Sequence, residues 1–280
     1  MTIQTKLIKL LGSFLSFFNL NWYNESIDSC AEAVRLCKSD GDFAGAGEIL
    51  KDILAIKMEL DDNDGVIDIY KDMASCFKLA KDYPQYVISL ENALQESICE
   101  HEFLHCTKIS SELAEYYEIN GKIDYAIELY EQIGLLFLNI EDQIESAILN
   151  YAKSAYLLAI VKKYDQAIHN YDICVQKSTN NVNHYIFKAM LCYIARNTNN
   201  IDELQKTARH YISMATSFDG SKEQQLIYNI LQSIWQSDSD LFKKSIREYD
   251  SVKKFDSLEI DLLLRIKDLL VSDFYSSEKE

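Results

Sequence analysis

The run from His101 to His105 has the spacing HExxH, which in zinc proteases places two imidazole ligands on one face of a helix. Glu102 would then serve as the general base. The residues that follow, Cys106-Thr107-Lys108-Ile109, do not continue that pattern, and no third ligand stands out downstream. Such proteases also hold substrate against a sheet edge, and the chain has no strand pattern. We therefore interpret the HExxH spacing as a chance match to the zinc-protease motif, with a zinc metalloprotease as a remote alternative.

Two other runs have the composition of a ligand loop but not its spacing. Residues 61–65 are acidic and end in Gly65, yet a calcium loop in that register would need carboxylates where Leu60 and Lys71 stand. Gly45 and Gly47 fit neither phosphate-loop pattern, and we expect them to let two helices approach closely. We therefore expect no enzyme, with no catalytic residues, no metal and no cofactor.

Four lysines recur across the middle of the chain: Lys78, Lys108, Lys153 and Lys188. In a chain built of repeats, equivalent positions line one surface, which would make these residues a basic binding surface. Judged by spacing alone, four scattered and solvated lysines fit as well or better.

The elements that position these residues follow from a pattern that returns four times, with shifts of 40, 40 and 41 residues. Its copies are Phe43-x-x-Ala46-x-x-x-Leu50, Tyr83-x-x-Tyr86-x-x-x-Leu90, Ile123-x-x-Ala126-x-x-x-Tyr130 and Tyr164-x-x-Ala167-x-x-x-Tyr171. Positions i, i+3 and i+7 share one helix face. A period near 40 leaves room for two helices and two turns, so the sequence predicts an all-α, TPR-like solenoid of antiparallel helical hairpins.

Composition limits the classes of function. The chain has 280 residues, one proline and a formal net charge of -16, which favours long helices and argues against nucleic acid as a partner. We interpret the acidity as a contribution to solubility in preference to a functional acidic surface. Seven cysteines with no CxxC spacing indicate a reducing, cytoplasmic setting.

Four regions are expected along the chain. Residues 1–22 are apolar and aromatic, residues 23–215 form the hairpin solenoid, residues 216–271 form a C-terminal helical bundle, and residues 272–280 form a flexible tail. The first region is too short for a spanning helix. A membrane-surface anchor, a buried helix and a signal peptide are each compatible with it, and the anchor is favoured because Phe, Leu and Trp next to Lys suit the interface.

Beyond the pattern, the residues resemble the soluble NSF attachment proteins of the α/β type. Tyr185-Ile186-Phe187-Lys188-Ala189-Met190-Leu191-Cys192 looks like a segment of that family, and the run from Glu248 to Ser251 looks like its C-terminal end. The match holds one register from about Gly12 to Val271. The resemblance implies an adaptor of SNARE disassembly in vesicle trafficking and membrane fusion, peripheral on membranes in the cytoplasm.

The resemblance also implies roles for particular residues. Lys78, Lys108, Lys153 and Lys188 fall where the family carries the lysines that grip the SNARE four-helix bundle (syntaxin-like). Glu248 and Asp250 fall at the end that faces the NSF-type AAA ATPase. An aromatic loop that attaches the family to membranes corresponds to residues 12–18, with contacts from Phe14, Leu15, Phe17 and Phe18.

Departures from the family pattern keep a second hypothesis open. Glu102 and Leu149 stand at positions where a basic residue is expected, few residues precede the aromatic segment, and the tail 278–280 has no leucine. The alternative is a mimic or competitor that binds SNAREs or NSF without supporting disassembly.

Overall fold

The computed structural model describes residues 3–196 and 200–277, with side chains described for 22–140, 142–196, 200 and 202–270. Throughout these residues every regular element is a helix, which confirms the all-α fold class. The chain divides into two compact units, Met1–Leu113 and Ala114–Glu280. Each is described by itself below.

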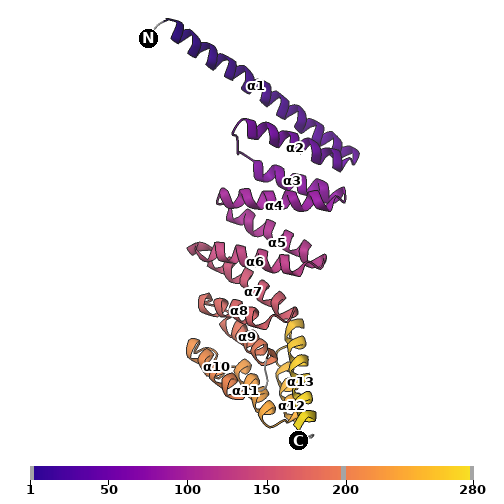
Figure 1. Cartoon of the computed structure of the whole chain (residues 1–280), viewed down its shortest axis with the longest axis vertical. Coiled ribbons are helices and arrows are strands. Elements are labelled where there is room, and N and C mark those ends of the chain that lie inside the picture. The colour runs from indigo at the N-terminus through magenta and orange to yellow at the C-terminus, as the bar shows by residue number, and fades with distance from the viewer. Residues whose placement is uncertain (1–2, 197–199, 278–280) are drawn as a thin grey trace. The chain divides into compact units, whose positions relative to one another are not determined.

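Unit 1 is a series of helices that pack in chain order, α1 on α2, α2 on α3 and α3 on α4 (Figure 1). Its helices are α1 (Ile3–Asp40), α2 (Phe43–Glu59), α3 (Val66–Leu79), α4 (Tyr83–Cys99) and the first part of α5 (Phe103–Ile119). The sequential pairing of neighbouring helices is the packing that a TPR-like solenoid requires.

Unit 2 continues the same pairing and then adds three helices against α9. It holds the end of α5, then α6 (Ile123–Leu138), the short 3₁₀ helix η1 (Glu141–Gln143), α7 (Ile144–Ile160), α8 (Tyr164–Lys177), α9 (Val182–Arg196), α10 (Ile201–Met214), α11 (Lys222–Trp235), α12 (Ser239–Asp250) and α13 (Ser257–Ser277). The last helix, α13, runs on to Ser277, so residues 272–277 of the segment expected to be a flexible tail are helical.

The recurring pattern opens the second helix of each hairpin, since its four copies begin at the first residues of α2, α4, α6 and α8. The residue at i+3 is almost fully buried in every copy, with Ala46, Ala126 and Ala167 at 0% exposure and Tyr86 at 1%. A position this closed accepts a methyl group, or a ring with a partner for its hydroxyl. The pattern is therefore the core-facing stripe of the second helices.

One turn geometry recurs in five of the helix connections, α1–α2, α3–α4, α4–α5, α5–α6 and α7–α8. A residue with positive φ stands two positions before the next helix: Gly41, Lys81, His101, Gly121 and Lys162. The residue after it donates its backbone N–H to a carbonyl five positions back, as Asp42 does to Cys37 at 2.9 Å. This is the Schellman arrangement, which satisfies carbonyls left open at a helix end.

Close helix approach in unit 1 depends on Gly47. A Cβ at this position would lie 2.6 Å from the ring of Phe77 on α3. Gly45 is used differently, because its backbone N–H is taken by the capping carboxylate of Asp42 at 2.9 Å. The expected close approach of two helices is therefore found at Gly47, whereas Gly45 serves the N-terminal cap of α2.

The N-terminal segment departs from the loop that the resemblance implied. Residues 12–18 lie inside α1, whose backbone is one helix from Ile3 to Asp40. Residues 3–22 hold one glycine and no proline, so nothing in their sequence interrupts a helix. The side chains of Phe14, Leu15, Phe17 and Phe18 lie outside the described ones.

Candidate partner-binding surface

The HExxH run does not have the helical geometry of a zinc-protease motif. His101 has φ 58° and is the left-handed residue of the α4–α5 turn, so it is not on a helix face shared with His105 on α5. Burial also raises the pKa of the Cys106 thiol to about 11, which keeps it protonated. No group of three or more potential ligands gathers anywhere among the described residues. Residues 101–105 form the end of the α4–α5 turn and the first residues of α5.

Lys78 lies on α3 and its charge is already met within unit 1. Its Nζ lies 2.8 Å from Glu112 Oε1 on α5, and the Tyr86 hydroxyl on α4 donates to the same oxygen at 2.9 Å. Nζ also stands 5.2 Å from the centre of the Tyr86 ring. Burial works to raise the pKa of Glu112, but the hydrogen bonds from Lys78 and Tyr86 outweigh it and hold the pKa below its usual value. Glu112 is therefore ionised at neutral pH.

Lys108 and Lys153 are the two expected lysines that carry no ion pair with a described residue. Lys108 is exposed on α5 in unit 1. Lys153 is half-buried on α7 in unit 2, with Nζ 5.1 Å from the centre of the Tyr130 ring. Leu149, one turn before it, is 50% exposed. Both lysines keep a charge that a partner can use.

Lys188 differs from the other three because it is buried. Its side chain on α9 is 10% exposed, and Nζ lies 2.7 Å from Asp256 in the segment before α13. Asp256 and Glu259 cap the start of α13 reciprocally, each accepting the other's backbone N–H at 3.0 Å or less. Lys188 thus ties α9 to the first turn of α13.

A cluster of titratable side chains, part of it buried, surrounds that connection. Burial lowers the pKa of His184 to about 4, with repulsion from Lys188 and Lys253 adding to the effect. Burial also raises the pKa of Glu259, whose Oε1 lies 3.9 Å from His184 Nδ1. Burial works to raise the pKa of Asp256, but its hydrogen bonds, the first of them from Lys188, outweigh it and hold that pKa down. The four groups hold α13 against α9.

Glu248 and Asp250 lie at the end of α12 with basic neighbours. Glu248 is exposed and 3.9 Å from Lys244, and Asp250 lies 2.6 Å from Lys254. The two carboxylates expected to face the ATPase are therefore each next to a lysine.

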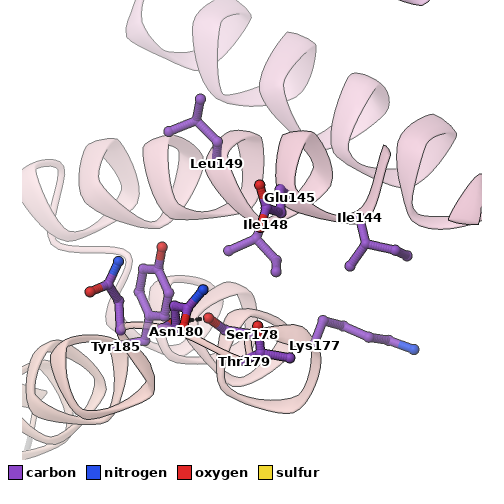
Figure 2. A pocket seen from close by; sticks show the side chains of 10 residues that line it. Ile144, Glu145, Ile148, Leu149, Lys177, Ser178, Thr179, Asn180 and Tyr185 are labelled. Carbon is purple, nitrogen blue, oxygen red and sulfur yellow. Dashed lines mark hydrogen bonds between the residues drawn. The ribbon is translucent and has the colours of Figure 1, made fainter. Parts of the chain in front are cut away.

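A cavity of about 420 Å³ lies between α7 and the turn before α9 in unit 2. Ile144 and Ile148 point from α7 toward the Ser178–Asn180 turn, and Tyr185 borders the far side (Figure 2). Its lining combines apolar side chains with one carboxylate, one lysine and several amides and hydroxyls. The cavity holds no pair of groups that could act as nucleophile and base.

The ion pairs follow the 40-residue period, although the sequence did not single them out. Lys38 and Lys78 stand five residues before a pattern copy, and Asp72 and Glu112 stand eleven before one. Lys38 reaches Asp72 at 2.8 Å as Lys78 reaches Glu112. A lysine five residues before one pattern copy and an acidic residue eleven residues before the next are the sequence signal that could have identified these ion pairs.

The fold defines a helical-repeat scaffold, and the described residues bring no set of catalytic groups together. A family model described as "Soluble NSF attachment protein, SNAP" matches residues 3–271. The chain belongs to this family, whose members are adaptors and not enzymes.

Individual relatives have low sequence identity to this chain, but their alignments cover most of it. The chain is similar to the human alpha-soluble NSF attachment protein, at 27% identity over 95% of this chain and 92% of that protein. It is similar to a probable vesicular-fusion protein sec17 homolog of Schizosaccharomyces pombe, at 25% identity over 91% and 90%. The match to the Dictyostelium discoideum alpha protein is shorter, with 27% identity over 66% of this chain and 64% of that one.

A solved structure, the apo form of the quorum sensor NprR from B. thuringiensis, aligns with 94% of this chain and 84% of that chain at a TM-score of 0.38 and 14% identity. Within the part of the chain that the structure describes, none of the helices has the length and apolar character that crossing a membrane requires.

Proposed function

We propose that this chain is an adaptor that binds an assembled SNARE four-helix bundle and recruits an NSF-type ATPase to it, on the cytoplasmic side of a membrane. The observation that carries the proposal is the family match over residues 3–271, with lysines on the first helices α3, α5 and α7 of successive hairpins. Lys108 and Lys153 would meet acidic side chains of the bundle. Exposed pairs are individually weak, so several must act together.

Membrane attachment forms part of the proposal. Phe14, Leu15, Phe17 and Phe18 would insert at the membrane surface and raise the local concentration of the adaptor. In α1 these residues follow Lys6 and Lys9 along one helical backbone. Flotation with anionic liposomes tests this, and replacing the three phenylalanines with serine should abolish it.

The first experiment is a pull-down on assembled SNARE complex, with and without liposomes. We expect Lys108→Glu combined with Lys153→Glu to weaken binding about tenfold or more, since each reversal turns an attraction into a repulsion. Lys206→Glu is the matched control, because Lys206 is an exposed lysine on α10, a second helix. No binding by the unmodified chain in either condition would rule out the SNARE role.

A second candidate function is a competitor that binds without supporting disassembly. Its support is that Lys78 is paired with Glu112 and Lys188 is buried, which leaves two of the four expected lysines unpaired. An ATPase assay with NSF and SNARE complex separates the candidates. Stimulated hydrolysis favours the adaptor, and binding without stimulation favours the competitor.

A further inference from the structure

The first helices of unit 1 carry two ion pairs of one kind, which we call the rungs: Lys38–Asp72 between α1 and α3, and Lys78–Glu112 between α3 and α5. Both have N–O distances of 2.8 Å. The four side chains are 34–55% exposed, so both charges of each rung face solvent. A partner lying on these helices therefore meets a lysine and a carboxylate together.

The rungs sit among balanced charges. In the described parts of α1, α3 and α5 within unit 1, five basic side chains accompany seven carboxylates, which are Glu25, Asp28, Glu32, Asp40, Asp68, Asp72 and Glu112. The basic side chains are Arg35, Lys38, Lys71, Lys78 and Lys108. This layer of helices is not a basic surface.

At the equivalent positions of the next repeat, in unit 2, the acidic and the basic residue exchange places. Five residues before the third pattern copy stands Glu118, and eleven before the fourth stands Lys153. The Tyr130 hydroxyl donates to Glu118 at 3.1 Å, and Lys153 lies over the Tyr130 ring at 5.1 Å. Tyr86 holds Glu112 and Lys78 in the same two ways. The same set of groups thus recurs in unit 2 with acid and base exchanged between helices.

An incoming carboxylate gains little at such a rung. It is attracted to Lys78 and repelled by Glu112, whose lowered pKa keeps it charged. The repulsion from Glu112 offsets part of the attraction to Lys78, because the two rung charges lie 2.8 Å apart. A partner that brings a carboxylate to the lysine and an ammonium to the acid satisfies both members.

From this we propose that the α1–α3–α5 face of unit 1 fits a helical bundle with alternating acidic and basic surface residues, in preference to a uniformly acidic bundle. The helical nature of the partner rests on the proposed function. The alternating charge pattern expected of the partner is inferred from the two rungs and does not depend on the proposed function. Asp72 and Glu112 are then residues that determine which bundle is bound.

The test uses the full chain and two synthetic four-helix coiled coils with one core, the first with only Glu on its surface and the second with Glu and Lys alternating. We expect the alternating bundle to bind about three- to tenfold more tightly at low salt. Glu112→Gln should raise affinity for the acidic bundle about two- to fivefold and lower it for the alternating one. Asp72→Asn should act in the same direction.

Glu48→Gln is the matched control, because Glu48 pairs with Lys51 at 2.7 Å on the second helix α2 and the change in net charge is the same. It should alter neither affinity. Tighter binding of the acidic bundle by the unmodified chain, or equal effects of Glu112→Gln and Glu48→Gln, would overturn the inference. Assembled SNARE complex is the third probe. If assembled SNARE complex binds but the acidic bundle binds more tightly than the alternating one, only this inference fails. If none of the three probes binds, the proposed function fails with it.

Discussion

Lys188 shows how burial decides what a charged residue can do. Its register suggested a partner contact, yet the side chain is 10% exposed and its charge is used by Asp256. A buried ammonium costs free energy unless an acid and further polar groups surround it. Here Asp256 and the ring of Tyr156, 5.9 Å away, provide that surrounding. Lys188 therefore acts on the protein's own C-terminal helices.

Lys188→Met is expected to lower the free energy of unfolding by about 1–3 kcal/mol, since it leaves Asp256 without its partner. The 41% exposure of Asp256 keeps the loss below that of a fully buried pair. Urea unfolding followed by circular dichroism measures it, with Lys206→Met as control. The double variant Lys188→Met/Asp256→Asn should recover part of the loss. A Lys188→Met protein as stable as the parent would show that the pair does not hold α13.

His184 makes stability depend on pH. In the unfolded chain its ring takes up a proton near pH 6.5, as model imidazoles do, whereas the folded ring stays neutral down to about pH 4. The unfolded state thus binds more protons in this window, so the free energy of unfolding falls as pH falls from about 6.5 to about 4. Because the side chain is 38% exposed, we expect a loss of only about 1 kcal/mol.

His184→Gln should flatten this part of the profile, measured by urea unfolding at pH 7 and pH 5. Asp256, with its lowered pKa, acts in the same direction at lower pH, and Glu259, with its raised pKa, acts in the opposite one. The comparison is therefore between variant and parent at each pH. Identical slopes for both would exclude His184 as the source.

At the scale of helices and turns, the five connecting turns explain both the regular period and the false zinc motif. Each turn places one residue in the left-handed region, where glycine is favoured but lysine and histidine also occur. His101 occupies that position, so its side chain leaves the helix path before α5 begins. A spacing of four residues has metal-binding meaning only where all five residues are helical.

His101→Gly should therefore stabilise the protein by about 0.5–1 kcal/mol, because glycine adopts positive φ without a Cβ conflict. Thermal unfolding measures the change, and elemental analysis of zinc gives an independent readout. Gly121→Ala at the equivalent turn should move stability the other way. Loss of bound zinc on replacing His101 would restore the metal-site reading.

The helices and their hairpins were predictable from the sequence, whereas the ion pairs between helices were not singled out by it. The residues at i, i+3 and i+7 of each copy mark one helix face, so hairpins follow from local order alone. The pairs Lys78–Glu112 and Lys188–Asp256 join residues on separate helices, 34 and 68 positions apart, and depend on how those helices pack. The loop implied for residues 12–18 failed for another reason, since it came from resemblance while the residues themselves favour a helix.

For the whole molecule, the formal net charge of -16 sets the long-range field that any partner meets. Local lysines act within about one Debye length, roughly 8 Å at physiological salt, while net charge governs the approach. If the proposed function holds, an acidic SNARE bundle is repelled at distance and attracted only near contact. The rungs lower the attraction further.

We therefore expect the association rate with an acidic SNARE bundle to rise, modestly, as salt increases from about 50 to about 150 mM. Stopped-flow fluorescence measures it, and a bundle with alternating charges is the control that should show little change. A steep fall of the rate with salt would mean that a basic surface dominates the encounter.

The shared turn geometry also bears on how such a chain can change. Gly, Lys and His all occupy the left-handed position, and the residues beside it differ in charge from turn to turn, while helix placement is preserved. The i+3 positions, at 0–1% exposure, have no such freedom. Mutations can therefore accumulate along the row of turns in each unit, and a new surface chemistry can arise there, without the stack of helices being rebuilt.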